Sequence, residues 1–292
     1  MPNAPMVDEP DAPPPHDTND APRPARRRSR TAAPAEGGSE KVAPVKKASA
    51  KKASPRKSGA RKASKAPPRA GTWALRAAKA IGLAAAGLVV VFVALTMIFA
   101  VVRPPTTPYM LAESVRQGGV RHTWVPMDRI APAMALSAVA AEDANFCRHW
   151  GLDLDAIRTA IDSRLGGAST ISQQVVKNVF LWHGRNWARK SLEAVMTPVV
   201  ELFWSKRRIL EVYLNVAEFD TGVFGVEAAA QHYFGRSAAD LTNRQAALLA
   251  AILPNPKERS PVDPSAFVNR RANAIADGAA TIRGTARASC FM

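Results

Sequence analysis

The apolar residues of this sequence first concentrate in one uninterrupted run, residues 80–102, which contains no charged side chain. A helix of that length spans the roughly 30 Å hydrocarbon core of a bilayer. Lys79 and Arg103 bracket the run. A cleaved signal peptide has a shorter apolar region and a short leading segment, whereas here 79 residues precede the run. The pattern therefore predicts one uncleaved transmembrane helix at 80–102.

After the span, apolar positions recur at helical spacing, and no convincing run of alternating strand residues is present. Residues 103–125 are Pro-rich and are interpreted as an irregular connector. Asp128 is expected to cap the first helix, and Pro198 to bend a long one. The expected helices cover residues 132–141, 154–165, 171–181, 186–203, 206–214, 226–234 and 246–253. We predict a mainly α domain at 126–257, followed by an extension at 258–292 that is helical in part.

Residues 1–70 differ from the rest because Pro, Ala, Ser, Lys and Arg dominate and no aromatic residue occurs. Such a segment cannot bury enough apolar surface to offset its ordering entropy, so 1–79 is expected to be a disordered basic tail. Residues 1–79 carry 18 Lys and Arg against 7 Asp and Glu, whereas residues 80–292 carry 22 Lys and Arg against 17 Asp and Glu. This excess before the span predicts a cytoplasmic N-terminus with the following domain outside. Binding to anionic lipids, weak DNA binding and a topological role remain open for the tail, and nucleic acid is the least favoured.

Two adjacent carboxylates, Glu142 and Asp143, end the apolar helical run at 132–141. The negative end of a helix dipole and partial burial both favour the protonated carboxyl group. Either effect brings a carboxylate toward the pKa that a general base needs near neutral pH. The alternative is that the two residues only polarise an exposed helix end.

A second polar stretch, residues 166–178, begins with a diglycine and continues into a helix that opens with Ser169 and Thr170. A helix N-terminus with hydroxyl groups is a suitable anion site. Within the helix, Gln173 shares a face with Lys177, and Gln174 shares one with Asn178, at i, i+4 spacing. Amides and one ammonium suit sugar hydroxyls and a phosphate, although an ordinary capped helix has the same pattern.

Further along, residues 185–193 place several cations near a second carboxylate, Glu193. The stripe at 206–215 is interpreted as mostly architectural. Cys147 and Cys290 both follow the span, where an oxidising compartment would permit a disulfide. Two unpaired thiols are an equal alternative, and neither cysteine has the spacing of a zinc site.

Four motifs occur in order along the chain: Glu-Asp-x-x-Phe-x-x-His-x-Gly at 142–151, Gly-x-Ser-Thr-Ile-x-Gln-Gln at 167–174, Arg-Lys-x-x-Glu at 189–193 and Lys-x-x-Ile-Leu-x-x-Tyr-Leu-Asn at 206–215. Together they resemble the peptidoglycan glycosyltransferases, the transglycosylase modules of penicillin-binding proteins, and above all the monofunctional biosynthetic transglycosylases. The likeness covers roughly residues 120–257. The chain departs from the family at Ser172, usually Thr, and at Leu192, where some members carry Lys. After the span it has no Ser-x-x-Lys motif, so no transpeptidase domain is expected.

The resemblance implies a lysozyme-like helical domain with a smaller membrane-proximal lobe, anchored by one helix in the bacterial inner membrane, with the catalytic domain in the periplasm. It implies transfer of the lipid-linked growing glycan onto the 4-hydroxyl of lipid II, with inversion and release of polyprenyl pyrophosphate. Glu142 would be the general base, and Glu193 would orient cations or the leaving group. The implied pyrophosphate-binding cations are Lys177, Arg185, Arg189 and Lys190. The implied cleft residues are Asp143, His149, Ser169, Thr170, Gln173, Gln174 and Asn178.

The implied partners are lipid II, the growing glycan and the inner membrane, while other cell-wall or division proteins are left open. No cofactor is expected to be obligatory, and a divalent cation such as Mg²⁺ or Mn²⁺ at the pyrophosphate is an open alternative. The candidates for membrane contact, with core packing as the alternative, are Phe180, Leu181, Trp182 and Trp187. A membrane-anchored muramidase-type hydrolase would not need the cations of 177–190, because cleavage of glycan by water releases no pyrophosphate. A non-catalytic scaffold is disfavoured by the intact motifs.

Overall fold

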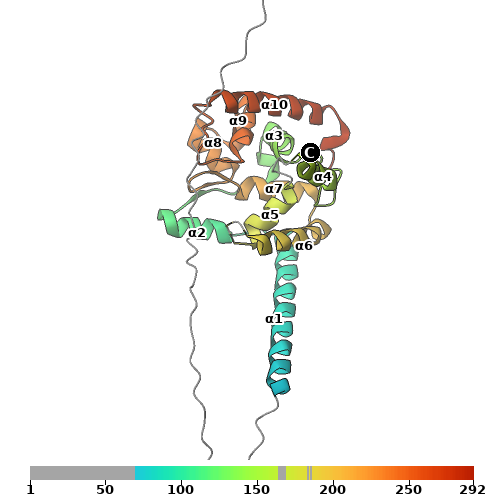
Figure 1. Ribbon diagram of the computed structural model, residues 1–292. Helices are drawn as coiled ribbons and strands as arrows, with labels where there is room; N and C mark the ends of the chain where they lie inside the picture. Colours follow the sequence, from blue (N-terminus) through green and yellow to red (C-terminus); the bar gives the residue numbers. More distant parts are fainter. Residues whose placement is uncertain (1–69, 164–168, 183, 185) are drawn as a thin grey trace, which may run out of the picture. The chain divides into compact units, whose positions relative to one another are not determined.

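The computed structural model describes residues 70–292 except 164–168, 183 and 185. The part of the predicted basic tail before residue 70, the diglycine Gly166–Gly167 and Arg185 lie outside the described residues. The described part of the chain is mainly α-helical, as predicted, with α1 preceding a bundle of shorter helices (Figure 1).

The first helix, α1, covers Ala70–Phe99, and its segment Thr72–Phe99 is long and apolar enough to cross a membrane. The helix therefore begins ten residues before the predicted span of 80–102 and ends three residues before the end of that span. The helix starts earlier because residues 70–79 are rich in Ala and other good helix formers, whatever their charge. It ends before Pro104 and Pro105, which disfavour helical backbone in the residues that precede them.

The predicted irregular connector contains a helix, α2, at Pro108–Gln117. Thr107 caps it through a side-chain hydrogen bond to the amide of Met110, and Gly118 ends it in the left-handed conformation. The buried residues of α2 are Tyr109, Met110 and Glu113. This short helical stripe is obscured in the sequence by the prolines around it.

Five helices build the core around the site. They are α3 (Pro132–Glu142), α5 (Ile171–Phe180), α7 (Lys206–Val216), α9 (Asn243–Ile252) and α10 (Ala266–Arg283). Helix α3 is buried at every position from Ala133 to Val139 because α9 and α10 pack on it. Helix α5 packs on α6 (Trp187–Phe203) and on α7 (Figure 1). Apolar packing therefore buries α3 as far as Val139, whereas its last residues, Ala140 to Glu142, are only partly buried.

The remaining described elements are short. They are α4 (Leu154–Ser163), α8 (Val226–Phe234), 3-10 turns at Met127–Arg129, Ala238–Asp240 and Ala286–Ala288, and strands β1 (Arg121–His122), β2 (Glu218–Asp220) and β3 (Val223–Phe224). The strands form a sheet in the order β1-β3-β2, with β1 parallel and β2 antiparallel to β3. Strands of two or three residues are too short to show alternation, which is why the sequence did not predict them.

Most helix starts were predicted to within one residue, and several have a side-chain cap. The helix expected from residue 246 instead starts at Asn243. Thr170, Asn186, Ser205 and Thr242 each accept a hydrogen bond from an amide in the first turn that follows. The expected cap of the first helix was wrong. Asp128 lies in the 3-10 turn, and α3 begins after Ala131 without any side-chain cap. Pro132 in the first turn fixes this start instead.

The predicted division at residue 257 does not separate two packing units. Helix α10 buries Val268, Ala272 and Ile275 in the same core as α3 and α9. The chain then returns to the loop after α3, where Cys290 forms a disulfide with Cys147. The extension is thus part of the helical domain.

Candidate active site

Glu142 is the last residue of α3, and only 13% of its side chain is exposed. Its Oε2 accepts a hydrogen bond of 2.9 Å from the side-chain amide of Gln174 on α5. Its Oε1 is buried and has no hydrogen-bond partner among the described residues, and Nη2 of Arg271 lies 3.9 Å away. Burial raises the pKa of Glu142, whereas Gln174, Arg271 and Lys177 oppose the rise. These are the surroundings of a carboxylate that can take up a proton.

Asp143 occupies the N-terminus of α5. Its Oδ2 accepts a hydrogen bond of 3.0 Å from the amide of Ile171, and its Oδ1 lies 2.7 Å from Nε2 of His149. The helix N-terminus predicted as an anion site is therefore already occupied by a carboxylate of the protein. Thr170 and Gln173 form a capping box, and the Thr170 hydroxyl also donates to the carbonyl of Gly151 at 2.6 Å. These predicted cleft residues hold the loop and helix that position Glu142.

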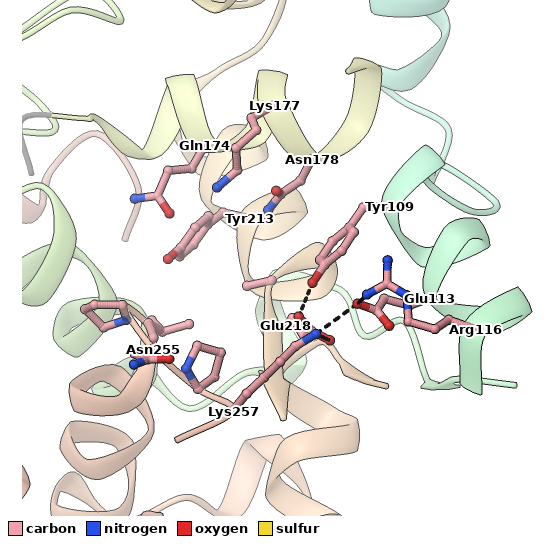
Figure 2. A pocket seen from close by; sticks show the side chains of 14 residues that line it. Tyr109, Glu113, Arg116, Gln174, Lys177, Asn178, Tyr213, Glu218, Asn255 and Lys257 are labelled. Atoms are coloured by element: carbon pink, nitrogen blue, oxygen red, sulfur yellow. Dashed lines mark hydrogen bonds and ion pairs between the residues drawn. The ribbon is translucent and has the colours of Figure 1, made fainter. Parts of the chain in front are cut away.

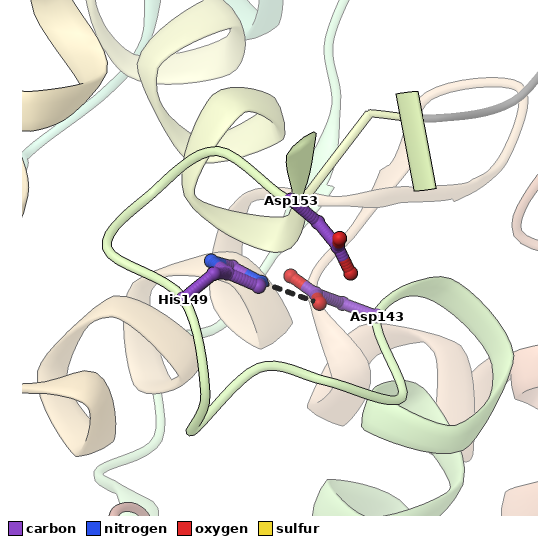
Figure 3. A group of neighbouring side chains, drawn as sticks. All are labelled: Asp143, His149 and Asp153. Atoms are coloured by element: carbon purple, nitrogen blue, oxygen red, sulfur yellow. Dashed lines mark hydrogen bonds and ion pairs between the residues drawn. The ribbon is translucent and has the colours of Figure 1, made fainter. Parts of the chain in front are cut away.

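A cluster of Asp143, His149 and Asp153 brings three ligand-type atoms within 4.8 Å of one another (Figure 3). Each carboxylate oxygen already has a protein partner. The Asp153 oxygens accept hydrogen bonds from the amide of Ala156 and the side chain of Asn145, at 2.9 and 3.0 Å. The donor set therefore fits a helix-capping network rather than a divalent cation.

A second group of charges lies where α5 faces α6. Glu193 is almost fully buried and pairs with both Arg189 and Lys190. Lys190 also donates to the hydroxyl of Ser169 at 2.8 Å. Lys177 forms no hydrogen bond or ion pair with any described residue, and burial, followed by the charge of Arg189, lowers its pKa. Burial likewise lowers the pKa of Lys190, with Arg189 and Lys177 adding to the effect.

The site opens into two cavities. The larger, of about 370 Å³, has Gln174, Lys177 and Asn178 of α5 on one wall and residues 253–257 on the opposite side (Figure 2). The smaller, of about 260 Å³, is lined by Glu142, Asp143, Ser169 and Thr170 among others. Glu142 lines the smaller cavity and its hydrogen-bond partner Gln174 lines the larger, so the pair lies between the two cavities. The predicted amides Gln174 and Asn178 and the cation Lys177 line the larger cavity, whereas Arg189 and Lys190 line neither.

Sequence reasoning missed several residues of this cleft. Tyr213, interpreted as architectural, lines the larger cavity, and burial with the charges of Glu142 and Asp143 raises its pKa well above the usual value. An ionic group at one end of the cavity consists of Tyr109, Glu113, Glu218 and Lys257. Arg271 approaches Glu142 from α10, in a region where no motif was seen. Only the buried positions of α10 at 268, 272 and 275 hint that this helix faces the core.

The four candidates for membrane contact divide into two pairs. Phe180 packs on Phe92 of α1, with ring centroids 5.1 Å apart, and Leu181 is buried. Core packing accounts for both. Trp182 and Trp187 are exposed, and Trp187 is 88% accessible. These two remain candidates for contact with a bilayer.

Residues 110–280 match the family model described as "Transglycosylase". The chain is also similar to three curated proteins, each described as a biosynthetic peptidoglycan transglycosylase. The protein of Jannaschia sp. is 66% identical over 194 residues, which is 66% of this chain and 81% of that protein. The protein of Rhodospirillum centenum is 47% identical over 71% of this chain and 92% of its own length. The protein of Caulobacter vibrioides is 45% identical over 66% of this chain and 87% of its own length.

Proposed function

The chain belongs to the transglycosylase family, and from this membership and the site we propose that it polymerises the glycan strands of peptidoglycan from lipid II. The observation that carries the proposal is the geometry of Glu142. It is a buried carboxylate that lines the smaller cavity, accepts a hydrogen bond from Gln174 of the larger cavity, and lies near the cations Arg271 and Lys177.

In the proposed reaction, Glu142 removes the proton from the 4-hydroxyl of the acceptor sugar. The acceptor oxygen then forms a bond to the anomeric carbon of the growing chain, and the bond from that carbon to the lipid pyrophosphate breaks. Attack opposite the leaving group inverts the anomeric configuration. Burial favours this role because it raises the pKa of Glu142 and so strengthens it as a base. The Gln174 amide fixes the carboxylate in one orientation.

The leaving pyrophosphate takes up the negative charge that develops. Lys177 lines the larger cavity and forms no hydrogen bond or ion pair with a described residue, so its ammonium is available to a phosphate. Arg189 and Lys190 are held nearby by Glu193, which keeps the two like charges in place. Preorganised cations of this kind stabilise a leaving group without reorganising during the step. Arg185 remains a predicted fourth cation, outside the described residues, and a divalent cation at the pyrophosphate remains an open alternative.

The proposal places α1 across the bacterial inner membrane, with a cytoplasmic N-terminus and a periplasmic catalytic domain. Exposed apolar side chains on α2 and α6 support contact between this domain and the bilayer. They include Leu111, Val115, Trp187, Val195 and Leu202, which are between 59 and 88% accessible. Both helices lie at the side of the domain from which α1 leaves (Figure 1). A lipid-linked substrate would reach the cleft from the membrane on this side. Binding to other cell-wall proteins remains a prediction.

The test compares purified wild-type protein with Glu142→Gln, using fluorescent lipid II in detergent and separating the products by size before and after muramidase. We expect long, muramidase-sensitive chains from the wild type and none from the variant, with unchanged circular dichroism. Asp155→Asn is the matched control, because the Asp155 side chain is 90% exposed and has no part in the proposed reaction. Polymer from well-folded Glu142→Gln would refute the proposal. Shortening of preformed glycan by the wild type would instead indicate a hydrolase.

A further inference from the structure

Arg271 lies next to the proposed base although it belongs to no motif of the sequence. Its Nη2 is 3.9 Å from Oε1 of Glu142 and donates to the carbonyl of Ala141 at 3.4 Å. Its Nε is buried and has no hydrogen-bond partner among the described residues. The guanidinium therefore sits at the negative end of α3, where it opposes the helix dipole beside Glu142.

Close packing of α10 on α3 fixes this position. A Cβ at Gly278 of α10 would lie 3.3 Å from Cβ of Ala140, closer than most side chains tolerate. Val268, Ala272 and Ile275 are buried on the same helix. Arg271 is held between these buried positions, and its backbone has little freedom to move away from Glu142.

We propose that Arg271 is a positioning residue, which keeps Glu142 ionised and directed for proton removal without forming a direct hydrogen bond to it. This inference rests on the proposed function, because it assigns Arg271 a part in the same reaction. The separation of 3.9 Å matters, because a close bidentate pair would stabilise the carboxylate so strongly that it would become a poor base. At this distance the charge assists ionisation and leaves Oε1 without a bound proton donor.

The other groups that face Glu142 do not replace Arg271. Gln174 of α5 donates one hydrogen bond, and Lys177 of the same helix adds a weaker attraction. Asp143, the next residue, repels the charge, and Tyr213 of α7 is neutral because its pKa is strongly raised. Arg271 is thus the cation with the larger effect on Glu142 among the described residues.

The sign of the effect can be measured. Removing the guanidinium raises the pKa of Glu142, so the base stays protonated to a higher pH. The acid limb of the pH profile of kcat/KM should therefore move upward by about one unit in Arg271→Gln, which means about tenfold lower activity below the limb. Above the limb the rate should approach that of the wild type. A purely structural defect would lower the rate equally at all pH values.

The experiment records lipid II polymerisation against pH for the wild type, Arg271→Gln and Arg271→Lys in detergent. Arg271→Gln removes the charge and Arg271→Lys retains it, so the acid limb of the lysine variant should lie close to that of the wild type. Arg270→Met, at an exposed neighbouring position of α10, is the control and should leave the limb unchanged. An unshifted limb in Arg271→Gln, or equal shifts in both Arg271 variants, would overturn the inference. Activity in Glu142→Gln would overturn the proposed function instead.

Discussion

The ammonium of Lys190 lies 3.0 Å from Oε2 of Glu193, one turn further along α6, and the other carboxylate oxygen of Glu193 pairs with Arg189. Glu193 is almost fully buried, whereas 42% of the Lys190 side chain is exposed. One buried carboxylate therefore holds two cations beside the cleft. This arrangement gives Glu193 a structural task that is separate from any contact with substrate.

Replacing Glu193 with Gln should destabilise the domain by about 3 kcal/mol, because the largely buried guanidinium of Arg189 loses its counter-charge. Lys190 should add little, since its ammonium can turn to solvent. Urea denaturation of the detergent-solubilised protein measures the change. Asp155→Asn breaks an exposed pair with Arg158 and should show no measurable loss. If Glu193→Gln unfolds at the wild-type urea concentration, the buried pair does not stabilise the domain.

The pH dependence of Lys177 should limit activity on the alkaline side. Burial and the neighbouring Arg189 lower its pKa, so the ammonium loses its proton at a lower pH than an exposed lysine. Polymerisation should fall as the pH rises through this pKa, because the leaving pyrophosphate loses one cation. Arg at position 177 stays charged at any working pH, so Lys177→Arg should move the alkaline limb upward.

The readout for Lys177→Arg is the pH profile of initial polymerisation rates, in parallel with the wild type. Lys206→Arg is a suitable control because Glu201, at 2.7 Å, holds the Lys206 ammonium away from the larger cavity. An alkaline limb that is the same in Lys177→Arg and the wild type would show that Lys177 does not cause it.

Reduction of the disulfide should lower stability. Cys147 and Cys290 are 143 residues apart, and closing a loop of this size stabilises a fold by about 3–5 kcal/mol in the chain-entropy treatment. Urea denaturation with and without reductant should show this loss. Cys290→Ser should match the reduced wild type and should not respond to reductant. Identical curves for oxidised and reduced wild type would contradict the prediction.

The elements that the sequence predicted well are those with a local signal. Thr170 and Ser205 cap helices by accepting a hydrogen bond from the amide three residues ahead, so the evidence for each helix lies within one turn of chain. Glu142 and Gln174 were likewise placed in the site by short motifs. Local chemistry was thus enough to nominate the base and its amide partner.

The features that were missed depend on contacts between distant parts of the chain. Arg271 meets Glu142 across 129 positions, and nothing in residues 258–292 announces that contact. The capping role of Asp143 was missed for the same reason: Asp143 lines the smaller cavity, but its carboxylate also accepts a hydrogen bond from the amide of Ile171, 28 residues away. Tertiary packing decides whether a polar side chain faces a cavity or caps a helix. Such packing cannot be inferred from a single sequence.

The disulfide also sets the route by which mechanical force would travel through the protein. A pull between α1 and a tag placed after Met292 would run through α2 and α3 to Cys147, and then cross directly to Cys290. Helices α4 to α10 lie inside the closed loop and would carry no covalent tension. Glu142 lies on the segment under tension, whereas Gln174 and Arg271 do not. Tension would therefore pull Glu142 away from these two contacts. Reduction would add about 500 Å of extensible chain to this path.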